Sequence, residues 1–314
     1  MKTKKSPLRF TGSRIFICAT SIFWIAVNTP ANAQTLLWLG YAQNQSDYFG
    51  DGRSQLEPAG GSFGISYEIS EQWQVSLSYA EFEGDGNWPV TGMGMDFSQA
   101  RNSARSESNL GALSFSWVQP DYSLSLAYSQ AENSDRALLR LPLSVEGVEG
   151  EDKVLSLSWD NFAEHQEILF GWSLGVQYAD SENRSLQVFF TEPTTTAATA
   201  FDQTSWSSFV ELSASHWIEQ PSFSWAPQLT ISWNWELESS GDPVIVVNRG
   251  DQRHIFTQFN DRIDGGFRAP DSGFWELAFN FDFHNDWSGQ IAYSKSLSVD
   301  SQIEGLSFDI SVLF

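Results

Sequence analysis

The chain closes with the ten residues GLSFDISVLF (305–314), in which apolar side chains stand at every second position and the last residue is an aromatic. Successive side chains of a strand point to opposite faces. One face would then carry an unbroken apolar row, namely Leu306, Phe308, Ile310, Val312 and Phe314. The other face would carry Ser307, Asp309 and Ser311. This pattern predicts a β-strand with one apolar face at the end of the chain.

The same alternation recurs from residue 34 onward, and no helical period is apparent. Twelve segments show it, the first starting at Thr35 and the last at Gly305. Three of the clearest are WQVSLSYA (from Trp73), YSLSLAYS (from Tyr122) and ILFGWSLGVQY (from Ile168). Their apolar face is large and aromatic, whereas the opposite face is small and polar. We therefore expect an all-β chain of half-buried strands.

The connections between these segments alternate between short and long. The short connections are 69–72, 118–121, 163–166, 218–222 and 284–286; the long ones are roughly 44–60, 83–107, 131–152, 180–205 and 239–272. A soluble sandwich explains alternating strands but not such long loops. Outer-membrane barrels combine short periplasmic turns, long extracellular loops and an even number of strands. The sequence thus predicts a transmembrane antiparallel up-and-down β-barrel of about 12 strands, with both termini periplasmic.

Aromatic and basic residues fit this arrangement. Aromatic residues gather at both ends of the strands, as two interfacial girdles require: Trp73, Trp117, Tyr122, Trp159, Trp217, Phe223 and Trp287 at the short turns, and Tyr79, Tyr128, Tyr178, Trp235 and Tyr293 at the other end. All ten arginines after residue 33 are predicted to lie in long loops: Arg53, Arg101, Arg105, Arg136, Arg140, Arg184, Arg249, Arg253, Arg262 and Arg268. They would bind lipopolysaccharide phosphates or pair with nearby carboxylates.

Pro227 interrupts the ninth strand pattern, because proline cannot donate a ladder hydrogen bond. The sequence leaves two alternatives: the strand begins at Gln228, or it carries a bulge near its periplasmic end.

Residues 1–33 differ in kind from the rest. Five basic residues precede the 13-residue apolar run IFICATSIFWIAV, and Ala31 and Ala33 form an A-x-A arrangement. This is typical of a secretory signal peptide cleaved after Ala33, since 13 residues are too few for a transmembrane helix. Bulky Ile17 before Cys18 argues against a lipoprotein site. We expect two segments, the signal peptide 1–33 and the barrel 34–314.

Removing the leader leaves a cysteine-free, strongly acidic chain. The leader holds Cys18, the one cysteine, and five of the 17 basic residues but none of the 39 acidic ones. The remaining 12 basic and 39 acidic residues give a net charge of −27. Disulfides and thiol catalysis are therefore excluded, and nucleic acid is not an expected partner.

The segment GLSFDISVLF resembles the C-terminal strand of bacterial outer-membrane β-barrels. The resemblance implies an outer-membrane location, contact with lipid and lipopolysaccharide, and reading of Leu306, Phe308, Ile310, Val312 and Phe314 by the barrel-assembly machinery. Within that class the rhythm is most similar to the twelve-stranded translocator barrel of autotransporters. Because the first strand pattern begins directly after the predicted cleavage site, neither a passenger domain nor a pore helix is expected.

Chemistry-bearing residues are few. Six carboxylates fall on the face opposite the aromatic residues and would line the lumen: Glu68, Glu211, Glu236, Glu276, Asp282 and Asp309. Carboxylates in a pore favour cations, although they would equally fill the lumen by hydrogen bonding. His254, with Asp251 and Asp264 nearby, is the one candidate base for a surface hydrolase. The GDG stretches at Gly50 and Gly84 are interpreted as turns, and no metal or cofactor is expected.

These observations predict a non-enzymatic, surface-exposed barrel with a structural or interaction role and a narrow pore, open or plugged. The alternatives are a cation-preferring channel for small solutes and a surface hydrolase centred on His254.

Overall fold

The structure is a computed structural model. It describes residues 34–47, 55–86, 103–140, 143–165, 167–190, 193–241, 244–256, 272–283, 286–297 and 302–314, so the predicted leader lies outside the described residues. Fifteen strands form one sheet in this part of the chain. No helix in the described ranges is long and apolar enough to cross a membrane.

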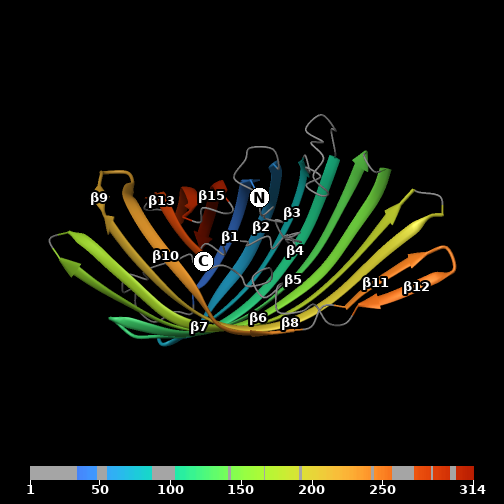
Figure 1. Ribbon diagram of the computed structural model, residues 1–314. Coiled ribbons are helices and arrows are strands. Elements are labelled where there is room, and N and C mark those ends of the chain that lie inside the picture. Colours follow the sequence, from blue (N-terminus) through green and yellow to red (C-terminus); the bar gives the residue numbers. More distant parts are fainter. Residues whose placement is uncertain are drawn as a thin grey trace, which may run out of the picture.

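Twelve of these strands close into an antiparallel barrel, which confirms the predicted fold (Figure 1). They are β1 (Thr35–Asp47), β2 (Gln55–Ser70), β3 (Trp73–Gly86), β4 (Ser103–Val118), β5 (Tyr122–Arg140), β6 (Leu143–His165), β7 (Ile168–Phe189), β8 (Thr195–His216), β10 (Ser224–Ser240), β13 (Ser272–Asp282), β14 (Trp287–Ser296) and β15 (Gln302–Leu313). The barrel closes where β1 pairs with β15, from Leu36 opposite Leu313 to Asp47 opposite Gln302. The other three strands are β9 (Ile218–Glu219), β11 (Val244–Arg249) and β12 (Gln252–Phe256).

The barrel has two unlike ends. The turn end carries the short connections and the closing pair of Thr35 and Phe314; the loop end is the opposite one. Glu167 and Asp286, with φ of 68° and 66°, stand in two of the short turns. Thr35 at the start of β1 and Phe314 after the end of β15 thus lie at the same end of the barrel, as an even strand number requires.

The outer face of the barrel is an apolar band. Leu39 and Leu212 expose 63% and 57% of their surface, and many other large apolar side chains are similarly exposed. Soluble monomers rarely expose contiguous apolar patches of this kind. Lipid accommodates such a band. Each of the twelve barrel strands pairs with a strand on both of its sides, so the sheet has no open edge where it crosses a bilayer.

Aromatic rings border the band at both ends, as the sequence predicts. At the turn end Trp73 stacks on Phe115 with ring centroids 4.8 Å apart, and Trp117 meets Tyr122 edge-on at 5.7 Å. At the loop end the rings of Tyr178 and Trp206 lie 5.1 Å apart. These amphipathic rings mark the two membrane–water interfaces.

The prediction of long loops is wrong for many of the residues concerned, which form strands instead. β6, β7 and β8 have 23, 22 and 22 residues, whereas β13 and β14 have 11 and 10. About ten residues suffice to cross a bilayer as a strand. The excess extends the sheet past the loop-end girdle on one side, and β11 continues it by pairing with residues 195–200 of β8. Figure 1 shows β11 and β12 as a hairpin beside the end of β8.

We call this extension of β5 to β8, together with β11 and β12, the raised wall.

The prediction that the arginines lie in long loops is also wrong. Six of them stand in strands: Arg105, Arg136, Arg140, Arg184, Arg249 and Arg253. All of them lie beyond the apolar band, where a strand meets water on both faces and charged residues carry no lipid penalty. Arg53, Arg101, Arg262 and Arg268 lie outside the described residues. Gly84 also lies in a strand, β3, and not in a turn; Gly50 is not described.

Pro227 stands inside a strand that neither begins at Gln228 nor bulges at the proline, so both alternatives predicted from the sequence are wrong. β10 begins at Ser224, and Pro227 pairs with Phe279 of β13. On its other side the ladder breaks: Trp225 pairs with Ile218 of β9, and pairing with β8 resumes at Gln228. The missing N–H of proline is thus accommodated by an interruption of the neighbouring strand at Trp217.

Candidate functional site

The last strand lies as the sequence predicts. Leu306, Phe308 and Phe314 expose 57%, 49% and 70% of their surface on the outer face. Ile310 and Val312 share that face by alternation, and Ser311 is buried on the other. The apolar row is therefore available to lipid or to another protein from outside the barrel.

The six predicted lumen carboxylates all fall on the inner face by strand alternation, at different depths. Glu68 and Asp282 stand near the turn end, and Glu236 stands near the loop end, beside a register shift between β10 and β8. The other three lie between them: Glu211 on β8, Glu276 on β13 and Asp309 on β15. The structure thus brings together only part of the predicted set.

An acidic track connects β6, β8, β13 and β15. The carboxyl group of Glu211 interacts electrostatically with those of Glu276 and Asp160, and the carboxyl group of Glu276 interacts with that of Asp309. Asp160 was not among the predicted residues, although alternation after Trp159 places it on the inner face. It is 5% exposed and accepts hydrogen bonds from Ser123 Oγ at 3.1 Å and Ser158 Oγ at 3.5 Å. These hydroxyls satisfy the carboxylate, which forms no ion pair with any cation in the described part of the chain.

Amide side chains form a relay on the same inner wall. Gln290 Nε2 donates to Asn280 Oδ1 at 2.8 Å, Asn280 Nδ2 donates to Gln228 Oε1 at 3.0 Å, and Gln228 Nε2 donates to Thr230 Oγ1 at 3.1 Å. The relay crosses β14, β13 and β10. It fixes the side chains of the wall next to the acidic track, and sequence reasoning missed it because it depends on strand register.

The inner face is less uniformly small than the sequence predicts. Trp38 and Phe209 point inward, and each ring covers a glycine on the neighbouring strand, Gly64 and Gly175 respectively. A Cβ at either glycine would collide with the ring. The missing side chain makes room for each aromatic residue, a cross-strand arrangement that compensates a glycine in a sheet.

A recess opens in the inner wall where β6, β7, β8 and β10 meet. Phe162 and Leu169 supply apolar surface, Glu211, Ser213 and Gln228 supply polar groups, and Gly171 contributes only backbone. The recess exists because small residues follow one another on β7 and β8, with Ser213 lying against Gly171. Its one charged group is the carboxylate of Glu211.

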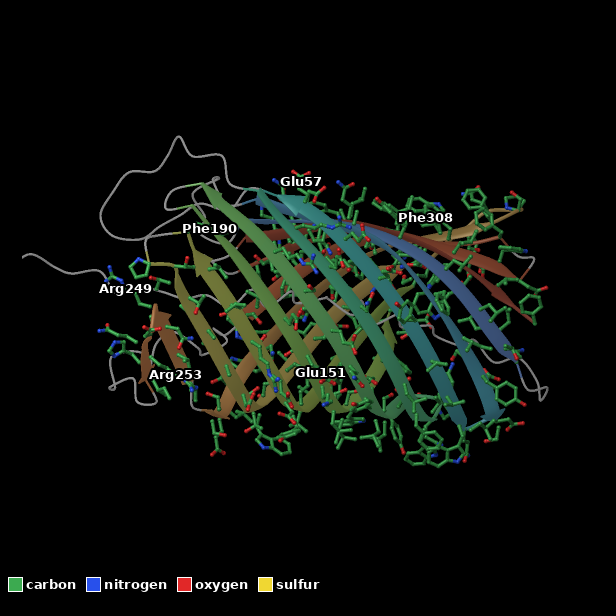
Figure 2. All side chains as sticks on the ribbon, turned by 90° about the vertical axis from the view of Figure 1, so that its right-hand side faces the viewer. Glu57, Glu151, Phe190, Arg249, Arg253 and Phe308 are labelled. Carbon is green, nitrogen blue, oxygen red and sulfur yellow. The ribbon has the colours of Figure 1, made fainter. Side chains whose placement is uncertain are left out.

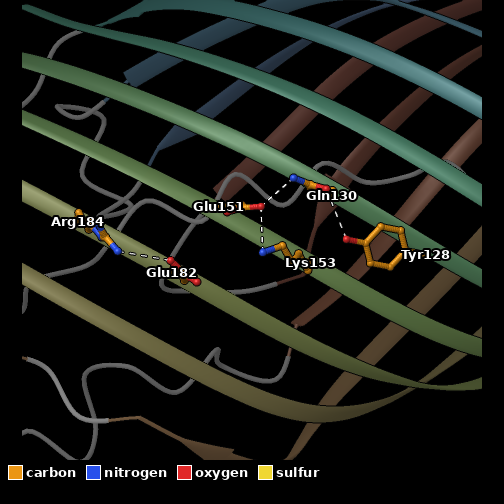
Figure 3. A network of polar contacts seen from close by, with 6 residues as sticks. All are labelled: Tyr128, Gln130, Glu151, Lys153, Glu182 and Arg184. Atoms are coloured by element: carbon orange, nitrogen blue, oxygen red, sulfur yellow. Dashed lines mark hydrogen bonds and ion pairs between the residues drawn. The ribbon is translucent and has the colours of Figure 1, made fainter.

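Just beyond the loop-end girdle, the outer face carries a polar collar of ion pairs (Figure 3). Lys153 Nζ lies 3.1 Å from Glu151 Oε1, and Gln130 Nε2 donates to the same oxygen at 2.7 Å. The hydrogen bond and charge of Glu151 raise the pKa of Lys153 above its ordinary value. Arg184 pairs with Glu182 at 3.6 Å on the next strand.

The collar continues around the barrel. Arg105 lies 3.0 Å from Glu107 and 3.4 Å from Glu83, and Lys295 lies 3.3 Å from Glu304. Lys153 pairs with Gln130, which follows girdle residue Tyr128 by two positions on β5. Lys295 follows girdle residue Tyr293 by two positions on β14, on the other side of the sheet order. The two lysines are thus at matching depth, at the level expected of lipid headgroups.

Beyond the collar, the outer face of the raised wall becomes apolar again. Leu186, Ala198, Val246 and Ile255 stand opposite one another on β7, β8, β11 and β12. Leu186 and Ile255 expose 50% and 53% of their surface. In Figure 2, Arg249, Arg253 and Phe190 lie toward the loop end at the left, and Phe308 lies toward the turn end at the right.

His254 lies on β12, opposite Val247, and its side chain is exposed. Among the described residues, no hydroxyl or carboxylate hydrogen-bonds its imidazole. Asp264 lies outside the described residues. The predicted base therefore has no positioned partner in the part of the chain that the structure describes.

Comparison with known proteins identifies the fold. No protein-family model and no curated protein sequence matches the chain. The translocator domain of the autotransporter NalP from Neisseria meningitidis is similar in structure, with a TM-score of 0.62, 10% sequence identity and coverage of 88% of each chain. The β domain of the Bordetella autotransporter BrkA gives a TM-score of 0.56 at 8% identity, covering 88% of this chain and 98% of that one.

These similarities, together with the closed barrel and its apolar band, define the class. The chain has the fold of an autotransporter-type outer-membrane β-barrel.

Proposed function

We propose that this protein is an integral outer-membrane barrel that displays its raised wall at the cell surface as an interaction platform. In this arrangement residues 1–33 are a signal peptide removed after Ala33, and the turn end faces the periplasm. The proposed role is binding and not catalysis; a hydrolytic activity that His254→Ala abolishes would contradict it.

The observation that carries the proposal is the apolar row Leu186, Ala198, Val246 and Ile255. Leu186 follows girdle residue Tyr178 by eight positions on the same face of β7. At roughly 3.3 Å per residue and a strand tilt of about 40°, it stands about 20 Å beyond the girdle. Lipid does not account for apolar side chains at that height, and the charged collar separates them from the band. Exposed apolar surface rimmed by polar residues is typical of interaction sites.

Two further partners belong to the proposal. The two lysines of the collar lie at headgroup level, where Lys153 and Lys295 would contact lipopolysaccharide phosphates. The outward row ending at Phe314 would be recognised by the barrel-assembly machinery.

Single cysteines test the orientation, because Cys18 in the leader is the one native cysteine. A cysteine at Ile255 on the raised wall should react with a membrane-impermeant maleimide on whole cells. A cysteine at Asp121 in a short turn should react only after the envelope is opened. The unsubstituted protein gives the background. The reverse labelling pattern would overturn the proposed display.

A second candidate function, a cation-preferring pore for small solutes, rests on the acidic track. Carboxylates along a lumen raise the local concentration of cations. Planar-bilayer recordings should then show stable cation-selective steps, and Glu276→Gln should lower the selectivity without unfolding the barrel. A silent bilayer containing correctly folded protein would end this reading while leaving the surface role intact.

A further inference from the structure

We propose that the recess around Glu211 is a binding site for a small primary ammonium compound, such as a short alkylamine, taken up from the lumen. The site does not depend on the surface role, and a barrel that conducts no ions still contains it.

The first step is the state of the Glu211 carboxylate. It is half-buried on the inner face of β8, and among the described residues no hydroxyl, amide or cation donates a hydrogen bond to it. Asp160, nearby on β6, is by contrast hydrogen-bonded by serine hydroxyls. A carboxylate withdrawn from water without a donor is unfavourable. A ligand that supplies charged N–H donors would relieve this cost through charge-assisted hydrogen bonds.

The second step is the local charge. The titratable neighbours that act electrostatically on Glu211 are Glu276 and Asp160, and both are acidic. The two lysines described lie in the polar collar on the outer face, each already paired with a glutamate. The potential at the recess is therefore negative, and it selects a cation over a neutral or anionic solute.

The third step is the shape and lining of the recess. Its volume is about 40 Å³, which is room for about three water molecules, or for an ammonium group with a short alkyl stem. Phe162 and Leu169 offer apolar contact for the stem, while Ser213 and Gln228 lie beside the carboxylate. A hard divalent cation would instead need several oxygen ligands around it. Among the described residues, no group of three or more His, Cys, Asp or Glu side chains is placed to hold a metal ion.

The depth of the recess depends on Gly171. A Cβ at this position would come within 2.5 Å of Ser213 Oγ. Any larger side chain at 171 would therefore occupy the space that the ligand needs. A substitution at Glu211 can thus remove the charge of the site, and a substitution at Gly171 can separately fill its space.

The test is isothermal titration of propylammonium chloride into the mature barrel, refolded in detergent and verified by heat-modifiable gel mobility. We expect saturable binding of one molecule per barrel, and none of propan-1-ol, which has the same stem without the charge. Glu211→Gln and Gly171→Val should each weaken binding at least tenfold. Glu68→Gln, which removes an inner-face carboxylate of β2 outside the recess and outside the acidic track, should change the affinity less than threefold.

Several results would overturn the site. Folded wild-type protein without saturable binding contradicts it, and so does unchanged affinity in Glu211→Gln. If Glu68→Gln weakens binding as much as Glu211→Gln, the cation is held by diffuse charge and not by the recess. If Gly171→Val does not fold, Ser213→Leu fills the same space from the neighbouring strand and carries the same expectation. The labelling experiment on the raised wall is unaffected by any of these outcomes.

Discussion

Thr35 and Phe314 are joined by two backbone hydrogen bonds: the Phe314 N–H donates to the Thr35 carbonyl at 2.8 Å, and the Thr35 N–H donates to the Phe314 carbonyl at 3.1 Å. The last residue of the chain thus closes the barrel against the first residue of β1 through its backbone. Its side chain takes no part in that contact and is 70% exposed.

Phe314→Ala should therefore separate assembly from stability. The backbone hydrogen bonds survive the substitution, so refolded protein should keep its heat-modifiable mobility and nearly its original unfolding midpoint. If the terminal ring is an assembly signal, the amount of folded protein in the outer membrane of cells should fall several-fold. Equal outer-membrane levels of wild type and variant would show that the ring is not read.

Leu157 and Ser156 test the two faces of the barrel wall. Leu157 lies in the middle of the apolar band and is 50% exposed, whereas Ser156 faces the lumen. Leu157→Arg should lower the free energy of unfolding by about 2–4 kcal/mol, as arginine does at the bilayer midplane. Ser156→Arg should cost clearly less, since its charge meets a polar lumen. Guanidinium unfolding in phospholipid vesicles measures both, and equal costs would contradict the assignment of faces.

The ring of Trp38 over Gly64 predicts a specific coupling. Gly64→Ala places a Cβ against the indole and should destabilise the barrel by about 1–3 kcal/mol, as overpacking does. In a Trp38→Ala background the same change should cost almost nothing. Gly111→Ala is the matched control, because a Cβ there meets nothing within 4 Å. A double-mutant cycle without coupling would refute the packing.

The collar predicts a pH effect at Glu304, which lies beyond the apolar band. The Tyr293 hydroxyl donates to its carboxylate at 2.9 Å and Lys295 lies at 3.3 Å. The Tyr293 hydrogen bond, and then that of Lys295, lower the pKa of Glu304 below 4.5. The stabilisation is therefore fully present above pH 4.5 and is lost as the pH falls through the lower folded-state value.

Unfolding midpoints of wild type and Glu304→Gln, measured from pH 7 downward, check this sign. Because the pair is exposed to solvent, the difference at pH 7 should be small and weakened by salt. It should vanish at pH values well below 4.5. A difference that grows on acidification would contradict the contact.

The strands that cross the apolar band could be predicted because lipid imposes a period of two. Leu124, Leu126 and Tyr128 alternate with small residues for that reason alone, and the same alternation places the six predicted lumen carboxylates on the face opposite the apolar band. The strand extensions could not be predicted. Beyond the girdle both faces meet water, so a stretch such as ENSDR (132–136) shows no alternation, and it forms a strand because β4 and β6 offer paired backbones.

The side-chain contacts of the lumen wall could be predicted from the sequence only in part. Asp160 could have been found by continuing the alternation past Trp159. The contacts of Trp38 with Gly64 and of Asn280 with Gln228 join different strands, and they require a register that no single strand specifies. The recess around Glu211 is hidden for the same reason, since it is assembled from four strands.

The central claim is that β15 faces lipid and lumen with alternate residues. Single cysteines carrying nitroxide labels at positions 306–311, in barrels reconstituted in vesicles, measure it by the relative accessibility to oxygen and to a water-soluble nickel complex. The structure predicts a period of two: high oxygen accessibility at Leu306, Phe308 and Ile310, and low at Ser307, Asp309 and Ser311. Uniform accessibility along the segment, or a period near 3.6 residues, would contradict the barrel.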